Sequence, residues 1–449
     1  MTNAEDAAPE EMSATPSRGG IFRALRERDF ALLWSGQSVS SIGDGVFTIA
    51  LALEALHIDR SPTGLAFVLA ARAVPSVRFS LVGGVVVDRV PKRVAMLVSD
   101  LVRGLAVGAI ALLVGHGSLR LWELIVMSAV FGTADAFFSP ASMAFLPELL
   151  PAELLVQGNA LSQTSSQFAQ GLLGPAAGGI VVAAVGSAWS FGIDAASFAV
   201  SSVCLLAMRA RSRPQPSGRS AVAEAREGLH YVRSRRWLMV SIPAAALANF
   251  FGISPLSVLL PLLVRHVLHS GPLALGLVFA AGGAAGVVAS LVVARLGAPR
   301  HRVTVLWTAY GVGGLAIGGM AFAHSVWVVG ALSSAEIGLI LYGYVLWVAM
   351  MQELVPKEML GRVFSLVYLF AFALGPLGIL AGGGVAASIG TRPALLLSGA
   401  VSGGICLLVV FVPGVRDPER TLSAAASDSS SSGDSNDGGD AGPGPAAAT

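Results

Sequence analysis

Charged residues are scarce in this 449-residue chain. Asp, Glu, Lys and Arg together make up 12% of it, hydrophobic residues make up 54%, and there are 53 glycines. Soluble globular domains carry about 25% charged residues, which cover their surface. With a mean hydropathy of +0.72, the composition indicates a membrane protein and excludes a nucleic-acid-binding protein and most soluble enzymes.

Cysteine and the common catalytic motifs are also nearly absent. Cys204 and Cys406 each lie in an apolar stretch without a partner at metal-ligand spacing, which favours single buried thiols over a disulfide framework. Neither of the two lysines in the chain, Lys92 and Lys357, follows a glycine, so there is no Walker A loop. There is also no Gly-x-Ser-x-Gly or His-Glu-x-x-His sequence. We therefore expect no enzyme activity, no metal site and no cofactor.

Apolar runs of about 20 residues, the length of a membrane-spanning helix, recur along the chain. Nothing alternates in polarity as the strands of a membrane β-barrel do. The sequence therefore predicts an all-α membrane protein with twelve transmembrane helices. The twelve spans lie near residues 30–57, 62–87, 94–115, 121–146, 159–185, 188–208, 238–264, 272–294, 303–323, 325–352, 361–388 and 392–412.

The positive charges predict how these spans are oriented. If the N-terminus is inside, 22 of the 29 Lys and Arg residues fall in inward segments, four in outward loops and three within spans. Cytoplasmic loops carry an excess of Lys and Arg. We therefore expect both termini to be cytoplasmic.

The two halves of the chain resemble each other. Glu148-Leu-Leu-Pro151 matches Glu353-Leu-Val-Pro356, and Leu173-Gly-Pro175 matches Leu374-Gly-Pro376, at offsets of about 200 residues. Six spans separate equivalent positions, so the copies run in parallel, as in transporters built from two bundles. The predicted organisation is a disordered cytoplasmic tail (1–20), an N-terminal six-helix bundle (21–208), a basic cytoplasmic linker with an amphipathic helix (209–237), a C-terminal bundle (238–413) and a disordered cytoplasmic tail (414–449).

Two motifs resemble those of the major facilitator superfamily. Gly84-x-x-x-Asp88-Arg89-x-x-Lys92-Arg93, between spans 2 and 3, is similar to the signature loop of that family, with Pro91 in place of a glycine. Gly174-Pro175-x-x-Gly178-Gly179, in span 5, resembles the end of its antiporter motif. Asp29-Phe30, Ser41-Ile-Gly43-Asp44 and Phe137-Phe-Ser-Pro-Ala141 resemble the drug:proton antiporter branch, which includes macrolide and siderophore exporters. The fourth span lacks the arginine that serves proton transfer in many other drug antiporters.

Polar residues within the spans are the candidates for the proton and substrate sites. Gln37, Ser41, Asp44 and Thr48 share one face of span 1, and Asp135 shares a face of span 4 with three serines. The resemblance implies that these two spans line a central cavity. The candidates are Asp44, Asp135, Arg72, Gln37, Gln163, Gln167, Asn249 and Glu336.

Each candidate has an alternative interpretation. Arg72 is either a cavity cation or the permanent ion-pair partner of Asp44 or Asp135. Glu54, near the outer end of span 1, is expected to reach water, and Asp194 in span 6 is a weaker candidate. The signature loop (Gly84, Asp88, Arg89, Lys92, Arg93) is interpreted as a cytoplasmic gate that pairs when closed. Gly174, Pro175, Gly178 and Gly179 allow close packing and a bend.

These observations predict a secondary transporter that exports an amphipathic small molecule in exchange for protons by alternating access. An importer or a lipid flippase with the same fold is an alternative, and an intramembrane enzyme is a less favoured one of another class. The expected partners are a small-molecule substrate, protons and the lipid bilayer, with no nucleic acid. We expect a monomer, driven by the proton gradient, in a bacterial cell membrane.

Overall fold

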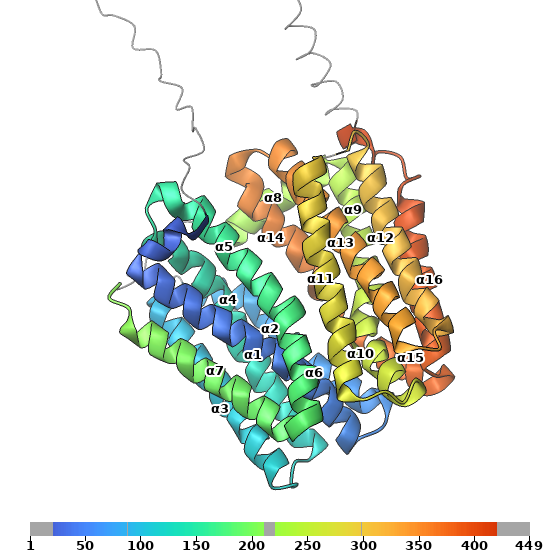
Figure 1. The fold of residues 1–449 in the computed structure, drawn as a ribbon. Helices are drawn as coiled ribbons and strands as arrows, with labels where there is room; N and C mark the ends of the chain where they lie inside the picture. Colours follow the sequence, from blue (N-terminus) through green and yellow to red (C-terminus); the bar gives the residue numbers. More distant parts are fainter. Residues whose placement is uncertain (1–20, 88, 211–220, 298, 420–449) are drawn as a thin grey trace, which may run out of the picture.

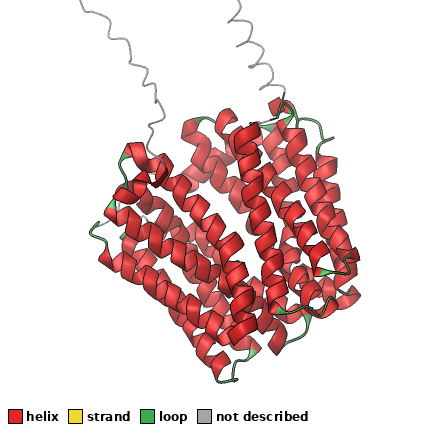
Figure 2. Cartoon of the chain, viewed as in Figure 1, coloured by secondary structure: helices red, strands yellow, loops and turns green. Residues whose placement is uncertain are grey.

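The computed structural model describes residues 21–87, 89–210, 221–297 and 299–419. Within these ranges the chain is helical throughout and contains no strand (Figure 2). Eleven helical stretches of the described residues are long and apolar enough to cross a membrane. A further 26-residue helix, α2 (Pro62–Val87), packs along α4 and completes the twelve predicted spans.

The helices form two bundles that stand side by side (Figure 1). In the N-terminal bundle, span 5 consists of α5, a π-helical turn η3 and α6. Its elements are η1 (Ile21–Arg26), α1 (Arg28–Ile58), α2, α3 (Lys92–Gly115), α4 (Leu121–Leu149), η2 (Ala152–Leu154), α5 (Leu155–Phe168), η3 (Ala169–Leu173), α6 (Gly174–Val185) and α7 (Ser187–Ala207).

The second bundle repeats this plan after the linker helix α8 (Ala221–Ser234). The described chain continues beyond its last helix to Glu419. Its elements are α9 (Arg236–Ala248), η4 (Asn249–Ile253), α10 (Ser254–Leu262), η5 (Leu263–Val267), α11 (Pro272–Leu296), α12 (Arg302–Gly319), η6 (Met320–Phe322), α13 (Val326–Leu354), α14 (Lys357–Ala373), α15 (Gly375–Ile389) and α16 (Thr391–Val409).

The sequence repeats fall at equivalent structural positions. Gly174-Pro175 and Gly375-Pro376 each begin the second half of a broken span, after η3 and after the end of α14. Lys92, the first residue of α3, pairs with Glu148, and Arg302, the first residue of α12, pairs with Glu353 at 2.6 Å. The repeat therefore encodes both a helix break and an ion pair in each bundle.

We call the end that carries η1 and the linker helix α8 the inner end (Figure 1), and the opposite end the outer end. One hydrophobic core joins the outer halves of both bundles, from Phe47 and Leu65 in the first to Leu259 and Leu395 in the second. At the inner end, by contrast, the buried apolar residues form separate clusters within each bundle. The bundles are therefore packed together at the outer end and separate at the inner end.

Glycines make the closest contacts between the bundles. A Cβ built on Gly179 in α6 would lie 3.0 Å from the Cα of Gly276 in α11, and one on Gly383 in α15 would lie 2.9 Å from the carbonyl oxygen of Pro62. Real Cβ atoms avoid contacts this short. Only glycine permits this approach of the helix backbones, as small residues do in membrane helices generally.

The predicted disordered tail from residue 414 is wrong for its first residues. Val415 is fully buried, and the carboxylate of Glu419 accepts a hydrogen bond of 2.7 Å from the backbone N–H of Thr304, in the first turn of α12. A carboxylate is stabilised there by the unsatisfied N–H groups and the positive end of the helix dipole. Residues 420–449, like the predicted tail 1–20, lie outside the described residues.

Candidate functional site

A buried ion network lies inside the N-terminal bundle. Arg103 of α3 donates hydrogen bonds to Asp100, one turn earlier, at 2.5 Å and to Asp135 of α4 at 3.2 Å. Ser201 of α7 donates to the other oxygen of Asp100 at 2.6 Å. The network thus joins α3 to α4 through the guanidinium of Arg103 and α3 to α7 through the carboxylate of Asp100.

The two ends of this network differ in exposure. The side chains of Arg103 and Asp100 are 3% and 0% exposed, whereas that of Asp135 is 39% exposed. Asp135 lies near the middle of α4, so this exposure is to space within the membrane region. The hydroxyl of Tyr368, from α14 in the other bundle, lies within electrostatic range of Asp135. Asp135 is therefore exposed at mid-depth of its bundle and within electrostatic range of the other bundle, and we call the space between the bundles the central cavity.

Aromatic rings surround the guanidinium of Arg103. Its Cζ lies 4.3 Å from the ring centroid of Phe138, 4.6 Å from that of Phe198 and 5.8 Å from that of Phe131. A cation over an aromatic face is attracted by the ring quadrupole, and more strongly so when water is excluded. The rings hold Arg103 between its two carboxylates.

Asp44 of α1 and Asp194 of α7 lie beside this network. One carboxylate oxygen of each, Oδ1 of Asp44 and Oδ2 of Asp194, is buried without a hydrogen-bond partner among the described residues. The carboxylate of Asp194 lies against Gly43, and its charge interacts with those of Asp44, Arg103 and Arg72. Buried polar atoms are almost always hydrogen-bonded, so this pair of orphaned oxygens needs an explanation.

Arg72 does not form the ion pair that the sequence suggested. Its guanidinium lies over the rings of Phe47 and Phe131, 5.3 and 4.6 Å from their centroids, whereas Arg103 pairs with Asp135. Arg103 forms these pairs because it lies one turn from Asp100 on α3 and because α3 packs against α4, which carries Asp135. Arg72 still acts on Asp44 through its charge.

The predicted polar face of α1 joins it to two neighbouring helices. The amide of Gln37 donates to Ser142 of α4 at 2.5 Å, and Gln170 of η3 donates to Ser41 at 3.4 Å. Gln163 and Gln167 lie on α5 with exposed side chains. Gln37 and Ser41 lie on the same face of α1 as Asp44.

The two candidates of the C-terminal bundle lie apart from the network. The side chain of Asn249 is used within its own bundle: it donates to the carbonyl of Ala371 at 3.0 Å and accepts from Ser254 at 3.2 Å, which braces the π-turn η4. Glu336 of α13 is 3% exposed and has no hydrogen-bonding or ion-pairing partner among the described residues. It stays a candidate for proton binding.

The predicted gate loop is described in part. Asp88 lies outside the described residues, and Gly84 belongs to the last turns of α2. Lys92 pairs with Glu148 of α4, and Arg93 donates to the carbonyl of Leu206 at the end of α7 at 2.8 Å. Arg89 is exposed. Lys92 and Arg93 therefore tie the start of α3 to two helices of their own bundle.

The antiporter-type motif packs against α1 on one side and against α11 on the other. On one side Gly174 meets the backbone of Gly45, and Gly178 meets that of Val46 in α1. On the other side Gly179 and Pro175 meet Gly276 of α11. The predicted close approach and bend are both present, because η3 distorts the helix directly before Gly174. The motif connects the helix of Asp44 with the opposite bundle.

Sequence reasoning missed Asp100 and Arg103 as site residues and gave Asp194 little weight. The signal was present: Asp100 and Arg103 are an acid and a base three residues apart in a membrane span, a spacing that places them on one helix face. An ion pair of this kind offsets part of the cost of ionised groups in the hydrocarbon region.

Comparison with known proteins identifies related transporters. The profile of the Major Facilitator Superfamily matches residues 33–378. The chain is 28% identical over 399 residues to the multidrug efflux pump Tap of Mycobacterium tuberculosis (84% of this chain, 92% of that protein). It is 25% identical over 395 residues to macrolide efflux protein A of Streptococcus pyogenes (85% and 94%). It is also 25% identical over 412 residues to the uncharacterized MFS-type transporter YfiS of Bacillus subtilis (87% and 93%).

Two groups of solved structures share the fold. A POT family transporter in complex with 5-aminolevulinic acid superposes with a TM-score of 0.69 at 14% identity, covering 86% of this chain and 96% of that one. A bacterial homologue of the iron transporter ferroportin, in an inward-facing state, gives a TM-score of 0.66 at 17% identity, covering 86% and 98%.

Proposed function

The chain belongs to the Major Facilitator Superfamily, and we propose that it exports an amphipathic small molecule across the bacterial cell membrane in exchange for protons. It is a multi-pass membrane transporter rather than an enzyme. The network of Asp100, Arg103 and Asp135, with one end buried and the other facing the central cavity, is the observation that carries this proposal.

An excess of negative charge in the network favours proton binding. Four carboxylates, of Asp44, Asp100, Asp135 and Asp194, interact with only two arginines, Arg72 and Arg103. If all were ionised, two negative charges would remain uncompensated, and isolated charges are costly in a medium of low dielectric constant. Protons, or one proton and a cationic substrate, restore neutrality.

Competition for Asp135 couples the two fluxes. Its carboxylate has one hydrogen-bonding partner among the described residues, Arg103 at 3.2 Å, and it is the partly exposed member of the network. A substrate with a cationic group that approaches from the central cavity favours the ionised form of Asp135. A proton that neutralises it removes this attraction, so proton binding releases substrate and substrate binding releases a proton.

Aromatic side chains of the other bundle suit an amphipathic substrate. Tyr368 and Phe372 of α14 have ring centroids 4.7 Å apart and are largely exposed, and the hydroxyl of Tyr368 lies within electrostatic range of Asp135. Apolar and aromatic walls with a few polar groups are typical of small-molecule sites. The names of the relatives, a multidrug pump and a macrolide exporter, support drugs as the substrate class.

Alternating access follows from the packing of the two bundles. The shared outer core and the glycine contacts close the outer end, and the separate inner clusters leave the inner end open, so this is an inward-open arrangement. Export requires the outer contacts to break and the inner ends to meet. We propose a functional monomer with both termini in the cytoplasm; import or lipid flipping would use the same fold with another direction or substrate.

The test is accumulation of antibiotics and of ethidium, a fluorescent lipophilic cation, in efflux-deficient bacteria that express the chain. We expect lower accumulation in expressing cells, reversed by a protonophore and by Asp44→Asn or Asp135→Asn. Glu153→Gln, which changes an exposed carboxylate at the inner end, is the matched control and should export normally. Export that persists undiminished in both aspartate variants would rule out this coupling site.

A further inference from the structure

A continuous polar stripe runs along α7. Ser187, Ser190, Asp194, Ser197 and Ser201 follow each other at steps of three and four residues, which place them on one face of a helix. The last four are between 0% and 5% exposed. The stripe is therefore enclosed within the N-terminal bundle and faces neither lipid nor the central cavity.

Asp194 is the only carboxylate of the stripe. Its Oδ1 accepts from Ser197 at 3.3 Å, whereas Oδ2 is buried and has no partner among the described residues. The charged groups that face it are Asp44 from α1, Arg72 from α2 and Arg103 from α3. Arg103 already pairs with Asp100 and Asp135, and Arg72 lies over aromatic rings. An orphaned carboxylate oxygen next to a second carboxylate is a place for a proton.

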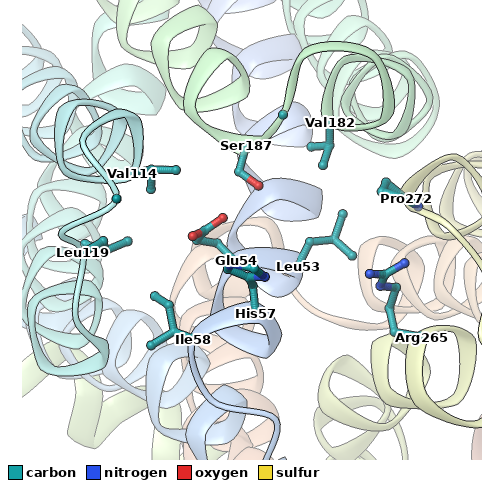
Figure 3. Close-up of a pocket in the computed structure, with 12 residues that line it drawn as sticks. Leu53, Glu54, His57, Ile58, Val114, Leu119, Val182, Ser187, Arg265 and Pro272 are labelled. Carbon is teal, nitrogen blue, oxygen red and sulfur yellow. The ribbon is translucent and has the colours of Figure 1, made fainter.

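The outer end of the stripe opens into a cavity of about 530 Å³ between the outer ends of the helices. Glu54 and His57 from α1, Ser187 at the start of α7, and Arg265 from η5 line it (Figure 3). Figure 3 shows Glu54 and Ser187 pointing toward the same space. Glu54, expected from the sequence to reach water, lines this cavity and is 8% exposed.

Ser190 lies in the stripe between Ser187, at the outer cavity, and Asp194. It is fully buried, one turn from Ser187 and one turn from Asp194, and seven residues of helix between Ser187 and Asp194 span about 10 Å. Buried water molecules can bridge polar groups that lie one helical turn, about 5 Å, apart, as successive members of the stripe do. On the opposing face of α1, Gly43 leaves room for the side chains of Asp194 and Ser197.

We propose that Asp194 is a proton-binding site that is loaded from the outer cavity along the polar stripe of α7, by a route separate from the central cavity. A proton from the outer solution binds the carboxylate of Glu54. Each serine hydroxyl then accepts a proton on its oxygen and passes its own proton on. The last transfer forms the O–H bond of a neutral Asp194 carboxyl group, and Glu54 is left ionised. This route deepens the proposed proton coupling and rests on it for its role.

The route explains how protons could enter while the central cavity is open to the inside. In this arrangement Asp135 is exposed to the inner solution, whereas Asp194 is shielded from it. Arg72 and Arg103 lie beyond Asp194, and their positive charges oppose the passage of further protons toward the cavity. Transfer of the proton from Asp194 of α7 onward to Asp44 of α1 is then a separate step.

The test is chemical and needs no transport substrate. Dicyclohexylcarbodiimide modifies protonated carboxyl groups in apolar surroundings, and peptide mass spectrometry identifies the residue. We would use right-side-out membrane vesicles from expressing cells, with the lumen kept alkaline and the outer medium either acidic or alkaline. Ser190→Ala interrupts the stripe with little change in volume. Ser202→Ala is its control, because Ser202 is also a buried serine of α7; its hydroxyl has no hydrogen-bond partner among the described residues, whereas that of Ser190 donates to the carbonyl of Gly186 at 3.4 Å.

We expect an acidic outer medium to increase modification of Asp194 several-fold, Ser190→Ala to remove most of that increase, and Ser202→Ala to leave it unchanged. Modification that does not change with the pH of the outer medium, or an equal increase in Ser190→Ala, would overturn the route. If instead Asp194 is modified as expected but ethidium export in cells ignores a protonophore, the proposed function fails and the proton site stands.

Discussion

Removal of Arg103 should be the most damaging single change in the N-terminal bundle. Arg103→Met keeps much of the side-chain volume but leaves Asp100, which is 0% exposed, without its charge partner. Breaking a buried ion pair by removing one partner costs about 3–5 kcal/mol. The pair with Asp135 adds little to this, because that carboxylate is 39% exposed and exposed pairs contribute about 0–1 kcal/mol.

A double-mutant cycle with Asp100→Asn isolates the pair. The combined variant Arg103→Met/Asp100→Asn removes both charges, and Asn still accepts from Ser201. We expect the double variant to be more stable than Arg103→Met alone by about 2–4 kcal/mol, most of the penalty for the unpaired buried charge.

The assay is unfolding of the purified protein by SDS in mixed micelles, followed by tryptophan fluorescence. Arg233→Met, on the exposed surface of α8, is the control and should change the free energy of unfolding by less than about 0.5 kcal/mol. If Arg103→Met behaves like Arg233→Met, Arg103 is not the central cation of the network and our interpretation is refuted.

The other predictions concern the helix contacts outside the network. Gly383→Val should hinder closure of the outer end and reduce export in cells, whereas Gly384→Val, whose Cβ meets nothing within 4 Å, should not; equal effects of the two would contradict the role of this contact. Glu419→Ala should lower the free energy of unfolding by about 0.5–2 kcal/mol, as loss of a helix cap does, and an unchanged value in SDS titration would count against capping. Lys92→Glu should reduce export, and Lys92→Glu/Glu148→Lys should restore it; failure of the reversal would show that the pair itself is not what matters.

The fold was largely readable from the sequence because the bilayer imposes a simple rule. A spanning helix needs about 20 apolar residues, and the twelve predicted stretches all fall on helices of the structure. A bend could be predicted at Gly174-Pro175 because proline disrupts the helix before it. The family model that matches residues 33–378 confirms the resemblance drawn from Asp88-Arg89 and Gly174-Pro175.

The ion network was less readable because pairing depends on how helices face one another. Periodicity places Asp44 and Asp135 on polar faces, but it does not say which of three intramembrane arginines reaches them. Arg72 was interpreted either as a cavity cation or as the partner of Asp44 or Asp135, and Arg103 is the observed partner of Asp135. Similarly, Glu419 lies in a polar, Ser-rich stretch, and nothing local in the sequence shows that it meets the start of α12, more than 100 residues away.

The most direct test of the proposed coupling is simultaneous measurement of ethidium and proton flux in proteoliposomes containing the purified protein. A pH-sensitive dye in the lumen reports protons while ethidium fluorescence reports the substrate. We predict that ethidium movement in one direction is accompanied by proton movement in the other, and that Asp44→Asn abolishes the proton signal. Ethidium transport without any change in lumenal pH would contradict proton exchange as the driving reaction.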